Sequence, residues 1–134
     1  MMAAVHKARL PVAILLMLIA LGCNRSQPGV SCAPLRGATT VRISQSGGRQ
    51  YVIENRYRVQ ALMNFANGRR AGFSARTTLP VGITSATFLE GTQPLLTFSA
   101  GDNFFSLACD GRQGVQEANR VQIAEFERLA AQQP

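Results

Sequence analysis

Residues 95–109, LLTFSAGDNFFSLAC, decide the fold class of this 134-residue chain. They contain two short β-prone runs, residues 95–100 and 104–109, on either side of Gly101-Asp102-Asn103, a combination typical of a turn. Alternate residues of a strand point to the same face, so one face of the second run carries Phe105, Leu107 and Cys109. The stretch therefore predicts two strands, the second of which points Cys109 into the core.

Similar segments lie upstream. Residues 39–45 alternate apolar and polar side chains and run into Ser46-Gly47-Gly48, so we expect a strand, a turn and a partner strand at residues 50–54. Residues 83–89 make another short β-prone run before Glu90-Gly91. A further strand is expected from residue 57, with one face made of Tyr57, Val59, Ala61, Met63 and Phe65 and with Leu62 as the exception.

Asn67-Gly68 indicates that this strand ends in a hairpin. A two-residue loop would oppose its apolar face with polar or empty positions, so we expect a loop of three or five residues. With residues 67–69 as the loop, Met63 opposes Phe73, and both strands bury the same side. In that register Arg58 and Arg76 become diagonal neighbours on the outward face.

The chain therefore predicts a mainly β (α+β) domain, an antiparallel sheet curled into a small sandwich or open barrel. After Asp110-Gly111 the period becomes helical, which predicts a C-terminal amphipathic helix of about five turns. Gln122 interrupts its apolar stripe, which comprises Val115, Ala118, Ile123, Phe126, Leu129 and Ala130. The helix either covers its own sheet, as most such stripes do, or docks on a partner.

The N-terminus indicates export. His6, Lys7 and Arg9 precede an apolar run, residues 10–22, that is too short to span a hydrocarbon core of about 30 Å as a helix. Residues 19–23, IALGC, resemble the lipobox of bacterial lipoproteins, in which Leu most often stands where Ala20 does. Residues 1–22 are then a signal peptide, residues 23–31 a flexible tether and residues 32–134 a single domain.

The lipoprotein resemblance implies acyl chains such as palmitate on Cys23 and therefore a stable membrane anchor. Asn24 is not the aspartate that retains many such proteins in the inner membrane, so the outer membrane, facing the periplasm, is the expected location. The alternative is ordinary cleavage after Ala20-Leu21-Gly22, which would release a secreted protein with an unmodified Cys23.

The cysteine count bears on this choice. The chain has three cysteines, and an exported protein with an odd number leaves one thiol free or paired between chains. If lipid occupies Cys23, Cys32 and Cys109 remain for one disulfide between the start of the domain and the end of its last predicted strand. The sequence therefore predicts that disulfide.

Composition restricts the chemistry. Removing residues 1–22 takes away His6, Lys7 and Arg9, which leaves twelve arginines, seven acidic residues and no histidine. The commonest general base and metal ligand are thus missing, so we expect no metal site, no cofactor and no enzyme activity. The carboxylates outside the predicted helix that could serve a hydrolase, the least favoured hypothesis, are Glu54, Glu90, Asp102 and Asp110.

The arginine excess suggests binding instead of catalysis. Candidate binding residues are Arg58 and Arg76 on the outward face and Arg112 in Gly111-Arg112-Gln113-Gly114, which is interpreted as a strand-to-helix connection. We expect a non-catalytic, lipid-anchored envelope protein that binds or scaffolds a periplasmic partner protein, comparable in size and anchor to pilotins, assembly factors and lysozyme-inhibitor lipoproteins. The alternative is an accessory that contacts cell wall or anionic lipid through its arginines; nucleic acid is not an expected partner.

Overall fold

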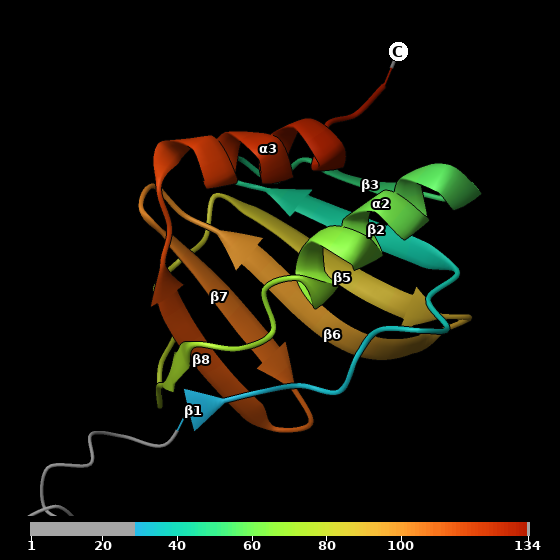
Figure 1. The fold of residues 1–134 in the computed structure, drawn as a ribbon. Helices are drawn as coiled ribbons and strands as arrows, with labels where there is room; N and C mark the ends of the chain where they lie inside the picture. Colours follow the sequence, from blue (N-terminus) through green and yellow to red (C-terminus); the bar gives the residue numbers. More distant parts are fainter. Residues whose placement is uncertain (1–28, 134) are drawn as a thin grey trace, which may run out of the picture.

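A computed structural model describes residues 29–133, in which eight strands form one antiparallel sheet and two helices lie against one of its faces (Figure 1). The strand order is β1-β4-β8-β7-β6-β5-β2-β3, so the sheet is not closed within these residues. The elements are β1 (Gly29–Val30), β2 (Thr40–Gln45), β3 (Gln50–Ile53), α2 (Arg56–Asn67), β4 (Phe73–Ala75), β5 (Thr84–Glu90), β6 (Gln93–Ala100), β7 (Phe104–Cys109), β8 (Arg112–Glu117) and α3 (Arg120–Ala130). The predicted mainly β fold with a C-terminal helix is confirmed.

The core lies between the sheet and the helices. Strands β6 and β7 pair as predicted, and Phe105, Leu107 and Cys109 are all buried. Phe98 is fully buried, and its ring centroid lies 5.0 to 6.3 Å from those of four other phenylalanines, a spacing at which aromatic rings attract one another. The four come from both helices and from two strands: Phe65, Phe73, Phe105 and Phe126. This cluster joins the two layers.

The strand predicted from residue 57 is wrong, because residues 56–67 form α2. Its buried residues include Val59, Leu62, Met63 and Ala66, which have helical spacing, so the Leu62 that broke the alternation belongs to the core. The Asn55 side chain accepts hydrogen bonds from the backbone N–H groups of two residues in the first turn, at 3.0 and 3.1 Å. Helical packing thus overrides a pattern that also fits a strand.

The hairpin predicted at residues 67–69 is therefore also wrong. Helix α2 follows β3 at one edge of the sheet and leads to β4, which pairs with β1 and β8 near the other edge. Arg58 lies on α2 and Arg76 just after β4, so the predicted outward-facing neighbours do not exist. The predicted pairing of Met63 with Phe73 fails for the same reason.

The C-terminal helix is shorter than predicted. Residues 112–117 form β8, and the two-residue turn before it has positive φ at both positions, 46° at Asp110 and 73° at Gly111. Asp-Gly favours this turn, which matches the twist of paired strands. The helix begins only after Asn119, and its 11 residues make about three turns. Gln122 completes a capping box with Asn119, so it starts the helix instead of interrupting it.

Helix α3 covers its own sheet. Ile123, Phe126 and Ala130 are buried, whereas Val115 and Ala118, predicted to share their stripe, precede the helix. Of the two expected roles for this helix, packing on its own core is therefore the one observed. Ile123, Phe126 and Ala130 are therefore not available as a docking surface for a partner.

The predictions for the remaining strands and for the tether differ in outcome. The β2–β3 hairpin and β5 are confirmed within one or two residues. The tether, by contrast, was expected to reach Ser31, but Gly29 and Val30 pair with β4 and Val30 is buried. The ordered sheet thus begins before the predicted end of the tether, because pairing with β4 places Val30 in the core.

Candidate functional site

The predicted disulfide between Cys32 and Cys109 is present, with a Cα–Cα distance of 6.1 Å. It joins the segment after β1 to the end of β7, which is the penultimate strand because β8 follows it. Both cysteines are buried. The bond therefore fixes residues 32–37, which we call the strap, against the sheet.

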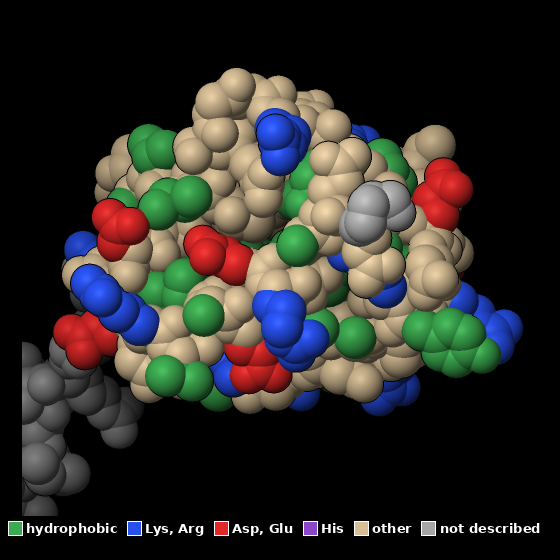
Figure 2. Space-filling view, turned by 90° about the horizontal axis from the view of Figure 1, so that it is seen from above, with side chains coloured by type: hydrophobic (Ala, Val, Ile, Leu, Met, Phe, Trp, Pro, Cys, Tyr) green, Lys and Arg blue, Asp and Glu red, His purple; other side chains and the backbone are tan. Residues whose placement is uncertain are grey.

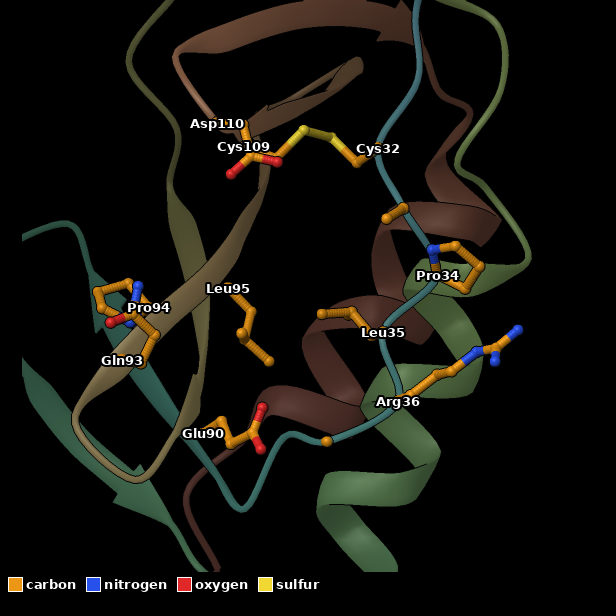
Figure 3. A pocket seen from close by; sticks show the side chains of 12 residues that line it. Cys32, Pro34, Leu35, Arg36, Glu90, Gln93, Pro94, Leu95, Cys109 and Asp110 are labelled. Carbon is orange, nitrogen blue, oxygen red and sulfur yellow. A yellow bond between two sulfur atoms is a disulfide. The ribbon is translucent and has the colours of Figure 1, made fainter.

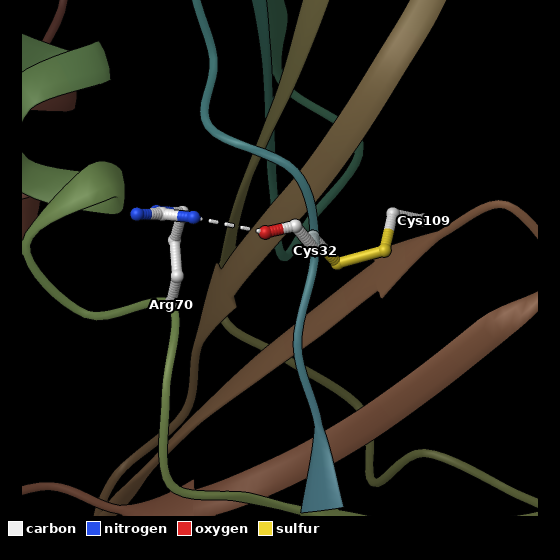
Figure 4. Close-up of a disulfide and its surroundings, with 3 residues drawn as sticks. All are labelled: Cys32, Arg70 and Cys109. Atoms are coloured by element: carbon white, nitrogen blue, oxygen red, sulfur yellow. Dashed lines mark hydrogen bonds between the residues drawn. A yellow bond between two sulfur atoms is a disulfide. The ribbon is translucent and has the colours of Figure 1, made fainter.

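Side chains hold the strap from the other side. Arg70 donates from Nη1 to the Cys32 carbonyl oxygen at 3.1 Å (Figure 4). The Asn67 amide accepts from Leu35 N–H at 2.8 Å and donates to the Leu35 carbonyl at 3.0 Å. These bonds give a segment outside the sheet the pairing that a neighbouring strand would provide. Nothing in the sequence around Asn67 indicates this role, because Asn67-Gly68 is instead typical of a hairpin.

A cleft of about 330 Å³ separates the strap from the β5–β6 hairpin and the end of β7 (Figure 3). Leu35 and Leu95 point toward one another across it. The Glu90 carboxylate approaches Gly37 so closely that a Cβ added there would lie 2.8 Å from Glu90 Oε2. We call this the strap cleft.

A second hollow, of about 490 Å³, lies on the α2 side of the same segment. Arg36 and Gly37 line both spaces, so the strap is a wall between them. Val59 and Met63 of α2 provide apolar lining, and Glu54 and Arg56 provide opposite charges. Each space thus combines a small apolar surface with charges of both signs, an arrangement suited to a peptide segment with mixed side chains.

The four candidate hydrolase carboxylates are partly brought together. Glu90 and Asp110 both line the strap cleft, although they are 20 residues apart in the sequence. Glu54 and Asp102 do not line it. Among the residues that the structure describes, no group of three or more His, Cys, Asp or Glu side chains is placed to hold a metal ion.

Arg58 has a structural role that the sequence did not predict. Its Nη2 donates to the Leu129 carbonyl oxygen at 3.2 Å and also to the Ala131 carbonyl oxygen. These carbonyls lie at the C-terminal end of α3, where backbone acceptors lack helical partners and a cation is favourable. The Tyr51 hydroxyl donates to the carbonyl of Ala130 in the same turn, and burial raises the pKa of Tyr51 while Arg58 and Arg49 oppose that rise.

Arg76 and Arg112, by contrast, line one hollow of about 610 Å³ at the β1 edge of the sheet. Its other lining residues are Gly29, Val30, Ala75, Thr77, Gly111 and Gln113. Two of the three predicted arginines are therefore neighbours, through strand pairing that differs from the predicted one. The side of the molecule that carries α3 differs from this hollow, because acidic and basic side chains are interspersed there (Figure 2).

Cys23, the predicted lipid attachment residue, lies outside the described residues. None of the helices within residues 29–133 has the length and apolar character needed to cross a membrane.

Searches against protein-family models, curated proteins and solved structures found no match for this chain.

Proposed function

We propose that this chain is a non-catalytic, lipid-anchored envelope protein that binds an extended segment of a partner protein in the periplasm. The supporting observation is the strap: residues 32–37 are fixed at several points and yet border open spaces on both sides. Ala33, Arg36 and Gly37 are exposed, whereas the backbone N–H and carbonyl of Leu35 are already bonded to Asn67, so an incoming chain would meet the strap at its exposed residues. An exposed, immobilised backbone segment can add a peptide as a neighbouring strand.

The chemistry of the strap cleft supports a peptide as the ligand. An apolar side chain of the partner would contact Leu35 and Leu95, while its backbone would pair with the strap. Glu90 and Arg36 at the rim would favour a segment with charges of both signs. The disulfide contributes by holding the strap in place before binding, which lowers the entropy lost on association.

A photo-crosslinking experiment in intact cells tests this proposal. A photoreactive phenylalanine analogue replaces Leu95 in the cleft, and in a control protein it replaces Val81, which is 92% exposed and lies in the connection from β4 to β5. We expect one defined protein adduct from position 95 and none from position 81.

A second variant makes the result specific. Arg36→Glu reverses the charge at an exposed position of the cleft lining and should weaken the adduct, whereas Arg42→Glu, the same change at an exposed position of β2, should leave it unchanged. The same adduct from both photoreactive positions would refute the cleft as the binding site. An adduct whose yield is unchanged in Arg36→Glu would do so too.

A further inference from the structure

The hollow at the β1 edge, which we call the arginine hollow, differs in charge from the other two spaces. Its lining contains Arg76 and Arg112 and no acidic residue. The strap cleft, in contrast, is lined by Glu90 and Asp110, and the hollow beside α2 by Glu54. Among these three spaces, the arginine hollow is thus the one whose lining carries positive charge and no acidic side chain; an adjoining hollow shares Gly111, Arg112 and Gln113 with it and is also lined by Asp110.

The frame of the arginine hollow is fixed without its guanidinium groups. Arg76 N–H donates to the Gln113 carbonyl at 3.1 Å, and Gln113 Nε2 donates to the Thr77 carbonyl at 2.7 Å. Both arginines are exposed, unlike Arg58, whose guanidinium group holds the end of α3. Their side chains can therefore contact a ligand outside the domain.

The position of the arginine hollow relative to the anchor adds a second argument. Gly29 lines it and is the sixth residue after Cys23. A fully extended chain covers at most about 3.6 Å per residue, so Cys23 lies within roughly 22 Å of Gly29. If Cys23 carries acyl chains, this edge of the sheet is held close to the lipid headgroups.

We propose that the arginine hollow rests on the membrane surface and binds the phosphate groups of anionic phospholipids. The inference depends on the lipid anchor of the proposed function and specifies which face of the domain meets the bilayer. Arginine suits this ligand because its planar fork grips phosphate oxygens in pairs. Val30 and Ala75 add apolar side chains to the lining of the same hollow.

This orientation leaves the other edge of the sheet away from the bilayer. The strand order places β1 at one edge and β3 at the other, so residues of the β2–β3 hairpin provide controls on the opposite side of the sheet from the arginine hollow. Arg42 and Arg49 are exposed on that side and carry the same charge. Replacing them removes as much positive charge as replacing Arg76 and Arg112.

Hydrogen exchange of the full chain, purified from membranes and reconstituted in lipid nanodiscs, tests the proposal. Exchange in residues 73–77 and 110–115 should be slower in discs containing phosphatidylglycerol than in phosphatidylcholine discs. A basic residue near an anionic surface changes binding by about fivefold, so Arg76→Gln should lower this protection roughly fivefold and the double variant with Arg112→Gln roughly thirtyfold. The variant Arg42→Gln/Arg49→Gln should keep the protection.

The other outcomes are distinct. Equal exchange in both disc types, with the protein still bound to them, would overturn the arginine hollow but leave the anchor intact. Loss of the protein from both disc types, with an intact mass that lacks acyl chains, would overturn the anchor and this inference together. Equal protection by inorganic phosphate in phosphatidylcholine discs would assign the arginine hollow to free phosphate instead of lipid.

Discussion

Removing the disulfide should destabilise the domain strongly. Cys32 and Cys109 are 77 residues apart, and cross-linking them restricts the unfolded chain. In the chain-entropy model a loop of that length contributes about 4.5 kcal/mol at 25 °C. Because both side chains are buried, replacement by Ala avoids leaving a polar group in the core. Cys32→Ala/Cys109→Ala should therefore lose about 4.5 kcal/mol of the free energy of unfolding.

Urea unfolding followed by circular dichroism measures this loss. The single variant Cys32→Ala should lose nearly as much as the double variant, because either replacement breaks the same bond, and the two effects should not add. A loss below about 1 kcal/mol would refute the reasoning, since it would mean that the strap closes no significant loop in the unfolded chain. Additive losses would show that the two side chains act by separate packing.

Three further predictions concern the sheet and the C-terminal helix. Arg58→Gln should lower the free energy of unfolding, measured in urea, by about 1 to 2 kcal/mol, because the end of α3 loses a charged donor. The control Arg56→Gln, at an exposed position of α2, should lower it by less than about 0.5 kcal/mol. Gly114→Ala should cost about 1 to 3 kcal/mol by the same assay, because the added Cβ would lie 2.8 Å from a backbone oxygen of β4; an unchanged midpoint would contradict this packing. Burial raises the pKa of Tyr51 above its ordinary value of 10.0, so the folded state holds the phenolic proton more tightly than the unfolded state. The contribution of Tyr51 to stability should therefore be fully present below pH 10 and be lost as the pH rises through the folded-state pKa. Unfolding measured from pH 8 to 11 should show this loss, and Tyr51→Phe should make it smaller.

The strands that the sequence predicted well are those whose alternation has one interpretation. Residues 95–109 contain apolar positions separated by a clear turn, and they form β6 and β7. Residues 56–67 fit two periods, since Val59 and Met63 share a face in a strand and also in a helix. Leu62 distinguished the two and was set aside, so the helix was missed.

Two Xaa-Gly pairs in this chain have different structural outcomes. Asp110-Gly111 and Asn67-Gly68 are equally strong hairpin signals, but only Asp110-Gly111 forms a two-residue hairpin turn, whereas Asn67 ends helix α2. Asn119 with Gln122 also carried a helix-start signal that would have placed α3 correctly. The candidate sites depended on these choices, and an incorrect register paired Arg76 with Arg58 instead of Arg112.

The sequence by itself determined what depends on local pattern and counting: the mainly β class, the C-terminal helix and the pairing of Cys32 with Cys109, while the anchor at Cys23 stays a prediction. Tertiary structure alone decided which distant side chains meet. The crossing of α2 from one half of the sheet to the other brings Asn67 and Arg70 to the strap, and the pairing of β4 with β8 brings Arg76 beside Arg112. The physical reason is that such contacts arise from burying a shared core, which no short window of sequence specifies.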